Sequence, residues 1–311
     1  SVHALATKLT FPHARVLSEL DRLRDAGCEL DHNPQHGLTL TRAGLGCWAD
    51  YLRATRAGVG IVEVYQTTAS TQDAARRLIA DRNTKADGAL VIADEQSAGR
   101  GRLGRRWIAP PGSALIFSRV CLTPSPDDTQ AINRLTYAAC VGLAQALDIW
   151  LVPLGKRAEI KWPNDVLIDG RKIAGILVEV VQDRVAGHFA IIGVGLNVGL
   201  TLEQLPTETQ EPGLRNRVTS LAMLGAHADR LAVLTQAVLA IDHALDESHA
   251  DHLLEQWRDR STLIGKHVRL SCEGIDYQGE VVDLDPSLGL ILRTTTGTLV
   301  HMPASTTTIL V

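Results

Sequence analysis

The chain has 311 residues, of which 45% are hydrophobic and 21% are charged, so it can bury a sizeable core and is not globally disordered. Its net charge of −4 is too balanced to indicate nucleic acid or a membrane surface as the main partner. Five cysteines without CxxC spacing disfavour both a disulfide framework and a metal cluster. No apolar run approaches the roughly 20 residues of a membrane span, and Ser1-Val2-His3 is neither a signal peptide nor a start with methionine. We therefore expect a soluble cytoplasmic protein whose N-terminus has been trimmed.

Residues 1–60 have the outline of a winged helix-turn-helix whose usual first helix is missing. Helices are predicted over 2–9 and 15–26, with the turn Thr10-Phe11-Pro12 between them. Two alternating segments, 29–31 and 38–41, flank Asn33-Pro34-Gln35-His36-Gly37, which is a hairpin signal. In a DNA-binding protein of this kind the second helix enters the major groove. The side chains that would reach DNA are His13, Arg15, Ser18 and Arg22.

The same N-terminal segment is equally consistent with a purely structural module. Residues 1–60 carry seven Lys and Arg against six Asp and Glu, which is a thin electrostatic footprint for a protein that binds DNA. DNA binding and a structural role are therefore both open from the residues alone.

The remainder of the chain predicts a mixed α+β region followed by a small β-domain. Strands are expected over 59–65, 89–94, 114–122, 159–162, 166–168, 172–181 and 188–198, and helices over 71–80, 133–147, 228–247 and 251–260. Ser70 or Thr71 is the expected N-cap of the first of these helices. The polar stretch 200–217 lacks periodicity and is long enough to be a functional loop. From residue 264 onward, five short strands with turns predict an SH3-like barrel.

The stretch from Gly99 to Trp107, GRGRLGRRW, carries four arginines and three glycines. Glycine lets the backbone approach a ligand, and arginine supplies forked cationic donors for phosphate or carboxylate oxygens. The glycines formally satisfy the dinucleotide pattern G-x-G-x-x-G, but Pro110-Pro111 cannot continue the helix that such a site requires. The sequence of a P-loop does not occur either. We interpret the stretch as an anion-binding loop at a strand end, with Trp107 available to stack on a flat base.

A second group of candidate functional residues comprises the segment 161–165 (KWPND) and Lys172. Asp165 directly follows a predicted strand, where a carboxylate can hold a divalent cation. Lys172 leads a near-continuous apolar strand, so its ammonium would be one of few charges near the sheet. The plain structural alternatives are a solvated strand end for Lys172 and a turn or side-chain cap for Asp165. Their occurrence together with an arginine-rich loop favours a shared anion-binding site.

Six segments of the chain, taken together, match the pattern of a known family. They are Ser70-Thr71, Gln96, GRGRLGRRW (99–107), KWPND (161–165), RKIAGIL (171–177) and GVGLNV (193–198). These segments resemble the biotin–protein ligases, and with the N-terminal segment the resemblance is to the bifunctional ligase and biotin-operon repressor type. It implies a central mixed-sheet catalytic domain related to class II synthetases and a C-terminal SH3-like barrel. The expected domains are residues 1–60 including a linker, 61–263 and 264–311.

The resemblance implies a reaction in two halves that uses ATP and Mg²⁺. The carboxylate of biotin attacks the α-phosphate of ATP to give biotinyl-5′-adenylate and pyrophosphate, and a lysine of a biotin carboxyl carrier protein then takes the acyl group. Arg102 and Lys172 are the expected catalytic residues, because two anions can meet only where cations stabilise them. Arg100 and Arg105 would cover the outer phosphates or order the loop. The polar stretch 200–217 would close over the adenylate.

The same resemblance assigns the other site residues, which fall into three sets. The expected biotin-binding residues are Ser70, Thr71, Gln96, Gly99, Arg100, Gly101, Arg102, Lys172, Gly175 and Gly195. The expected ATP-binding residues are Arg102, Arg105, Trp107, Asn164, Lys172 and Asn197. The expected Mg²⁺ ligands are Asp165, Asn164 and Asn197.

Operator DNA and a second copy of the chain are further expected partners, and no membrane is expected. The chain departs from the family pattern in lacking the first winged-helix segment and in having Phe11-Pro12-His13 at the start of the recognition helix. Both departures bear on repression rather than on ligation. Two alternatives stay open. One is a lipoate–protein ligase, which shares the fold and the adenylate chemistry but not GRGRxGRxW. The other is a winged-helix regulator with a non-catalytic ligand-sensing domain.

Overall fold

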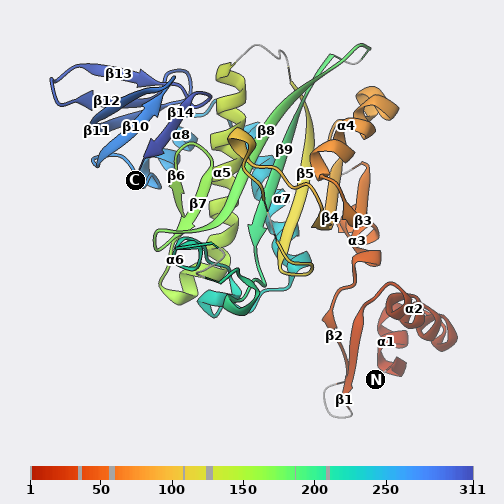
Figure 1. Ribbon diagram of the computed structural model, residues 1–311. Coiled ribbons are helices and arrows are strands. Elements are labelled where there is room, and N and C mark those ends of the chain that lie inside the picture. The colour runs from red at the N-terminus through yellow and green to blue at the C-terminus, as the bar shows by residue number, and fades with distance from the viewer. Residues whose placement is uncertain are drawn as a thin grey trace.

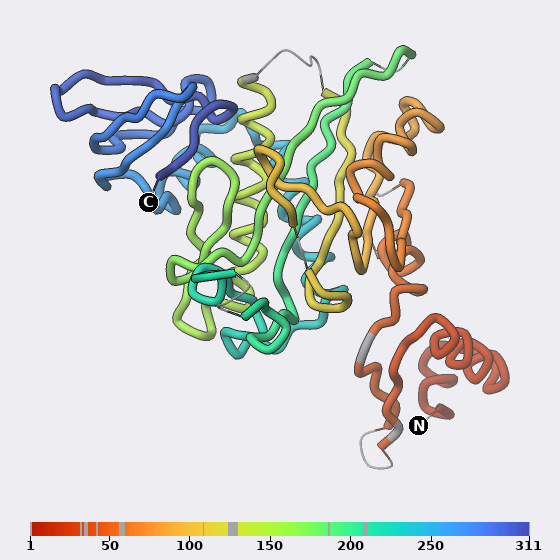
Figure 2. The backbone as a smooth tube through the Cα atoms, viewed as in Figure 1, coloured from red at the N-terminus to blue at the C-terminus, as the bar shows by residue number. Residues whose placement is uncertain are grey.

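The computed structural model describes residues 2–33, 37–55, 60–107, 109–123, 129–185, 187–207 and 211–310. Its strands form three sheets, of two, seven and five strands (Figure 1). The predicted hairpin turn at 34–36, part of the linker at 56–59 and residues 208–210 of the polar stretch lie outside the described residues. Figure 2 shows that the N-terminal and C-terminal parts of the chain lie on opposite sides of the seven-stranded sheet.

The N-terminal residues form two helices followed by a two-stranded hairpin and a connecting helix. The elements are α1 (Val2–Leu9), α2 (His13–Asp25), β1 (Glu29–Asn33), β2 (Gly37–Arg42), the 3-10 helix η1 (Leu45–Cys47) and α3 (Trp48–Thr55). A small core of Ala6, Val16 and Leu20 joins the two helices. The second helix begins two residues earlier than predicted, at His13, because Pro12 occupies its N-cap. The predicted antiparallel hairpin is confirmed.

The central sheet has the strand order β3-β4-β5-β9-β8-β7-β6 and is mixed. β3 and β4 run parallel, whereas every other neighbouring pair in this sheet is antiparallel. The strands are β3 (Val62–Thr68), β4 (Leu90–Gln96), β5 (Ala114–Thr123), β6 (Glu159–Lys161), β7 (Asp165–Ile168), β8 (Arg171–Asp183) and β9 (Gly187–Asn197). All seven occur where alternation or apolar runs predict strands.

Helices cover both faces of this sheet and leave room for a cavity on one of them. They are α4 (Thr71–Arg82), α5 (Thr129–Leu151), α7 (Arg230–Asp246) and α8 (Asp251–Asp259). Successive strand residues point to opposite faces. Thus Phe117 and Ile192 pack in the core with α5 and α7, whereas Val120 and Ile191 pack with α4. Gly193 and Gly195 of β9 line a cavity beside α4.

Helix α5 is longer than predicted and corrects one expectation from the sequence. Residues Gln130–Leu154 are long and apolar enough to cross a membrane, with a mean hydropathy of 1.5, so the expectation that no segment approaches this length was wrong. Within the protein 61% of the 18-residue apolar window of that segment is buried, and its apolar residues pack with those of α7 and the sheet. A helix that is apolar on most sides has the composition of a core helix as well as of a membrane span.

The C-terminal residues form an antiparallel sheet of order β13-β12-β11-β10-β14. Its strands are β10 (His267–Cys272), β11 (Ile275–Asp285), β12 (Gly289–Thr294), β13 (Leu299–Met302) and β14 (Thr307–Leu310). Arg258 of α8 joins this sheet to the central region through two 2.8 Å hydrogen bonds to Asp283. The remaining short elements are η2 (Asn83–Ala86), η3 (Arg102–Gly104), η4 (Val152–Leu154), η5 (Leu202–Gln204), α6 (Leu214–Arg217) and η6 (Ala222–Leu224).

Candidate functional site

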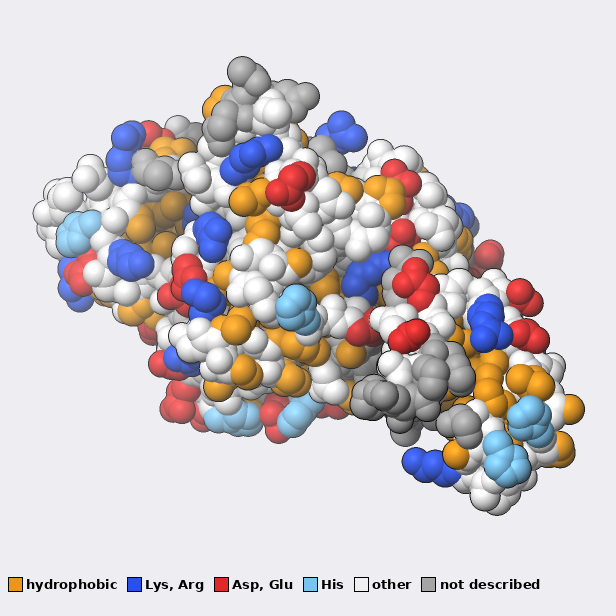
Figure 3. Space-filling model, turned by 90° about the horizontal axis from the view of Figure 1, so that it is seen from below, with side chains coloured by type: hydrophobic (Ala, Val, Ile, Leu, Met, Phe, Trp, Pro, Cys, Tyr) orange, Lys and Arg blue, Asp and Glu red, His pale blue; other side chains and the backbone are white. Residues whose placement is uncertain are grey.

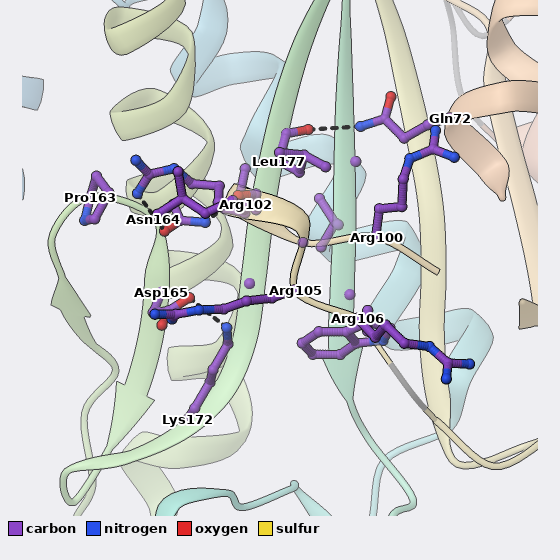
Figure 4. Close-up of a pocket in the computed structure, with 18 of the residues that line it drawn as sticks. Gln72, Arg100, Arg102, Arg105, Arg106, Pro163, Asn164, Asp165, Lys172 and Leu177 are labelled. Atoms are coloured by element: carbon purple, nitrogen blue, oxygen red, sulfur yellow. Dashed lines mark hydrogen bonds and ion pairs between the residues drawn. The ribbon is translucent and has the colours of Figure 1, made fainter. Parts of the chain in front are cut away.

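A cavity of about 210 Å³ lies between the arginine-glycine loop, the strands β7, β8 and β9, and the C-terminal strand β14 (Figure 4). It brings together most of the residues that the sequence singled out. The predicted residues that line it are Ser70, Thr71, Gln96, Arg100, Gly101, Arg102, Arg105, Trp107, Asn164, Asp165, Lys172, Gly175 and Gly195. Gly99 and Asn197 do not line it. The arginine-glycine loop (99–107) and the segment 161–165, which are more than 50 residues apart in the chain, therefore line the same cavity.

One side of the cavity is a network of uncharged polar groups at the start of α4. Ser70 caps the helix by accepting from the backbone N–H of the second helical residue at 3.3 Å, as its position predicts. Gln96 Oε1 accepts from the backbone N–H of Thr71 at 2.7 Å and from its hydroxyl at 3.2 Å. Ser118 in turn donates to Thr71 Oγ1 at 2.8 Å. These bonds fix the Gln96 carbonyl and leave its Nε2 as the donor end of the amide.

The arginine-glycine loop is a closed turn and not the start of a long helix. The backbone N–H of Gly101 donates to Arg105 O at 2.7 Å, and that of Trp107 donates to Gly99 O at 3.1 Å. Between them lies only η3, which contains Leu103 at a left-handed φ of 56°. Gly99 is required for this closure, since a Cβ there would lie 2.5 Å from Trp107 O. Of the residues that follow the third glycine, the described ones at 105–107 and 109–110 are not helical, as the prolines predicted.

The arginines of the loop have different partners. Arg100 donates twice to Asp73 on α4, at 2.7 and 2.8 Å, and this hydrogen bonding lowers the pKa of Asp73 and raises that of Arg100. Arg102 donates to Asn164 Oδ1 at 3.4 Å and to the carbonyl of Ala304, which follows β13. Burial lowers the pKa of Arg102. Figure 4 shows the Arg105 side chain extending towards Asp165.

Lys172 and Asp165 form an ion pair across β7 and β8, with Nζ 2.6 Å from Oδ1. The ammonium also lies 5.6 Å from the centre of the Trp107 ring. Gly175 makes room for it, because a Cβ there would be 2.9 Å from Lys172 Nζ. Both side chains are about two-thirds buried, so this pair is neither a solvated strand end nor a simple turn cap. The sequence placed both residues in the site but did not predict that they contact each other.

Only one of the three expected Mg²⁺ ligands presents a carboxylate to the cavity. Asn164 Nδ2 donates to Ile176 O at 2.6 Å, and Asn197 Nδ2 donates to Thr219 O at 3.0 Å. Among the described residues, no group of three or more His, Cys, Asp or Glu side chains is placed to hold a metal ion. Mg²⁺ is commonly bound by one or two carboxylates together with substrate phosphates and water. These residues therefore fit an Mg²⁺ ion that is held by Asp165 together with phosphate oxygens of a substrate. They do not form a site in which Asn164 and Asn197 complete the coordination.

Several residues that line the cavity were not predicted from the sequence. Gln72 donates to Leu177 O at 2.9 Å and lies against Gly193, where a Cβ would be 2.6 Å from its Nε2. Residues 307–309 of the C-terminal sheet also line the cavity. The role of Gln72 could have been predicted, since the glycine pattern of β9 indicates that another group approaches its backbone closely. The role of residues 307–309 could not, because it depends on how two sheets that are distant in the sequence pack together.

The sequence was compared with known families and proteins. A family model described as the biotin/lipoate A/B protein ligase family matches residues 64–197. The bifunctional ligase/repressor BirA of Bacillus spizizenii is 30% identical over 243 residues, which cover 75% of this chain and 70% of that protein. The biotin–[acetyl-CoA-carboxylase] ligase of Mycobacterium tuberculosis is 34% identical over 206 residues, which cover 64% of this chain and 71% of that protein. The chain belongs to the biotin protein ligases.

A solved structure agrees with this assignment. A mutant biotin protein ligase from Aquifex aeolicus in complex with biotin has a TM-score of 0.64 at 25% identity, covering 80% of the present ligase and 98% of that chain. The likeness is to an α+β protein with a central mixed sheet and a C-terminal antiparallel sheet. Although the family description includes lipoate ligases, the Mycobacterium tuberculosis relative and the Aquifex aeolicus structure are both named for biotin, which counts against the lipoate alternative.

Proposed function

We propose that the protein is an ATP-dependent ligase that forms biotinyl-5′-AMP from biotin and ATP and transfers the biotinyl group to a lysine of a biotin carboxyl carrier protein. One observation carries this proposal. The arginine-glycine loop, the Lys172–Asp165 pair and the uncharged Ser70–Thr71–Gln96 network surround one cavity. Cationic groups on one side and neutral hydrogen-bonding groups on the other suit a ligand with an anionic and a ureido end.

The uncharged side of the cavity would hold the ureido head of biotin. Gln96 has its carbonyl engaged by Thr71, so its Nε2 can donate to the ureido oxygen. The hydroxyls of Ser70 and Thr71 can serve as donors or acceptors for the same group. Gly175 and Gly195 leave room on the strand surface for Lys172 Nζ and for the Trp107 ring, which would border the bound ligand. Selectivity would follow because a ligand without matching polar groups leaves these buried groups unpaired.

The charged side would bring the carboxylate of biotin to the α-phosphate of ATP. Lys172 is held within the cavity by Asp165, and an incoming anion would share its ammonium. Arg102 would join Lys172 by exchanging its bond to Ala304 O for a ligand oxygen. Arg105 would cover the outer phosphates, while Arg100 orders the loop through Asp73. Fixed cations stabilise the charge that develops as two anions react, and they need little reorganisation.

Bound Mg²⁺ would neutralise charge on the phosphates of ATP. Asp165 is the residue that would hold it, with phosphate and water oxygens completing its coordination. Trp107 would pack beside the adenine base, and Asn164 would position Arg102 through their 3.4 Å hydrogen bond. Asn197 would act indirectly, by fixing residues near 219 at the end of the polar stretch. Residues 200–217 would close over the adenylate and exclude water.

The domain assignment follows the same reasoning. Residues 1–60 would be a winged helix-turn-helix, 61–263 the class II synthetase-like catalytic domain, and 264–311 an SH3-like barrel. The two helices and hairpin at the N-terminus and the five-stranded C-terminal sheet support this division. A homodimer and a cytoplasmic location stay predictions.

Repression of biotin synthesis genes is a second proposed function, favoured by the resemblance to a bifunctional relative. His13, Arg15, Ser18 and Arg22 would contact operator DNA. In the unbound protein Arg22 pairs with Glu19 at 2.8 Å, and Arg15 lies 4.2 Å from the centre of the Phe11 ring. On the face in Figure 3, the described basic side chains of the N-terminal lobe are scattered and do not gather in a patch. A gel shift with operator-length DNA, with and without biotinyl-5′-AMP, tests this role.

Pyrophosphate release tests the ligase proposal and the role of Lys172 together. Lys172→Ala should reduce biotin-dependent pyrophosphate release by about 100-fold or more, since it removes a transition-state cation. Lys156→Ala is the matched control, because Lys156 also pairs with an aspartate, Asp169, at 2.5 Å but lies outside the cavity. Equal loss in both variants, or release that is as fast with lipoate as with biotin, would contradict the proposal.

A further inference from the structure

Two cysteines outside the ligase site lie side by side where the N-terminal lobe joins the connecting segment. Cys28 lies between α2 and β1, and Cys47 ends η1 immediately before α3. Their sulfur atoms are 3.5 Å apart, although the residues are separated by 19 positions in the chain. Both thiols are free in this structure. A disulfide bond would require the sulfurs to approach by about 1.5 Å from this distance.

The backbone holds this pair in place. The segment that precedes Cys47 crosses the end of α2 so closely that a Cβ on Gly44 would lie 2.1 Å from Ala26 O. The N–H of Gly44 donates to Cys28 Sγ at 3.3 Å, and Cys47 Sγ donates to Gly44 O at 3.0 Å. The backbone of Gly44 is thus hydrogen-bonded to both sulfur atoms. The proximity of the thiols is therefore a property of the chain crossing and not of two chance rotamers.

The pair can be reached by small molecules. Both cysteines line a cavity of about 760 Å³ between the N-terminal lobe and the start of α7. Its other walls are formed by parts of α2, β2 and α3. Burial and the neighbouring Cys28 raise the pKa of Cys47 to about 11, so its reaction is slow at neutral pH. By contrast, Cys140 is fully buried in the catalytic core and does not line this cavity.

We propose that Cys28 and Cys47 form an oxidation site that converts from two thiols to an intramolecular disulfide. A hydroperoxide is the oxidant by chemical class. One thiol loses a proton and attacks the peroxide oxygen, which gives a sulfenic acid and releases water or an alcohol. The second sulfur then displaces the hydroxyl of the sulfenic acid as water, and the S–S bond forms. In total, two thiols lose two protons and two electrons, and the peroxide O–O bond is reduced.

The disulfide fastens the base of β1 to the segment that enters α3. It restricts the motion of the N-terminal lobe relative to the connecting helix α3, because the covalent link prevents the segment before Cys47 from separating from the end of α2. Neither cysteine lines the ligase cavity, so we expect no direct effect of the disulfide on the groups that line it. The pair is therefore a redox control on the lobe that we propose binds DNA. This inference stands whether or not the ligase and DNA-binding roles are correct.

Peptide mapping tests the site directly. The full-length protein is treated with hydrogen peroxide, alkylated with N-ethylmaleimide and digested without reductant. The expected result is a linked peptide containing Cys28 and Cys47, which dithiothreitol converts to two free peptides. Cys47→Ser removes the linked peptide, whereas the control Cys140→Ser retains it. Alkylation of both thiols at peroxide doses that oxidise a free dithiol would overturn the proposal. So would oxidation of Cys47 to a sulfinic acid with Cys28 still reduced, or a link between two chains.

Hydrogen exchange tests the consequence for the lobe. In the oxidised protein, amide exchange in β1 and in the segment before α3 should slow by about tenfold, and dithiothreitol should reverse the change. The same treatment should leave exchange in the catalytic sheet unchanged. A linked peptide without any change in exchange at β1 would contradict the assigned effect on the lobe, while leaving the oxidation site established.

Discussion

Substitution of Gly195 by alanine tests how the arginine-glycine loop is held against the sheet. A Cβ at this position would lie 2.4 Å from Cε2 of Trp107 and 2.7 Å from Cζ2. Ordinary carbon–carbon contacts are about 3.5 Å or longer, so the indole must move by about 1 Å. Trp107 closes the loop through its backbone bond to Gly99, and its displacement therefore moves the loop arginines as well.

The magnitude follows from the cost of overpacking. Insertion of one methyl group into a packed contact costs about 1–3 kcal/mol. If the whole cost destabilises the conformation that binds biotin, 1–3 kcal/mol corresponds to a rise of about 5- to 150-fold in the dissociation constant for biotin. Gly199→Ala, two residues after the end of β9, is the matched control, because a Cβ there would be 3.5 Å from its nearest neighbour, an ordinary contact. That variant should bind biotin within about twofold of the parent protein.

Isothermal titration with biotin measures both variants, and a double-mutant cycle identifies the cause. In a Trp107→Ala background the new methyl group has space, so Gly195→Ala should then have little additional effect. Strictly additive losses for the two substitutions would refute the packing argument, because they would show that the methyl group acts without the indole. Unchanged affinity in the single variant Gly195→Ala would refute it as well.

Two further predictions concern ion pairs. Asp73→Asn should loosen the loop and weaken biotin binding, with less than about 1 kcal/mol of stability lost because Asp73 and Arg100 are partly exposed. Since the pKa of Asp73 is lowered by Arg100, the parent protein's advantage over this variant should be complete well above pH about 4, the unfolded-state value, and should be lost progressively as the pH falls through the lowered folded-state pKa, as urea unfolding across pH can measure. Asp242→Ala should cost about 3 kcal/mol in urea unfolding, because it leaves the largely buried Arg119 guanidinium without its carboxylate. The exposed pair made by Asp259 supplies the control, and Asp259→Ala should cost under about 1 kcal/mol; equal costs for the two would contradict the burial argument.

Local rules were sufficient to predict most elements of the fold. The Ser70 cap and the apolar runs of β5 and β9 each depend on neighbours in the chain, and each is confirmed. The prolines after Trp107 were enough to reject a dinucleotide site. Helix α5 was predicted too short because its first turn begins with polar residues, and its true length is set by tertiary packing.

Contacts between distant segments could not be predicted in the same way. The sequence indicated that Lys172, Asp165 and Arg102 belong to one site, but not which of them pair. In the structure Lys172 contacts Asp165, and Arg102 contacts a carbonyl 202 residues away in the chain. Such partners depend on the packing of the C-terminal sheet against the catalytic region, which has no local signature. The assignment of Asn197 to the site came from the family resemblance of the segment 193–198, and Asn197 does not line the cavity.

Transfer of biotin to an acceptor lysine is the most direct test of the central proposal. The full-length protein is incubated with ATP, magnesium, biotin and a purified biotin carboxyl carrier protein, and the carrier is analysed by mass spectrometry. The proposal predicts one biotinyl group on one lysine, dependent on both ATP and biotin, and its loss with Lys172→Ala. An unmodified carrier, or equal modification when lipoate replaces biotin, would contradict it.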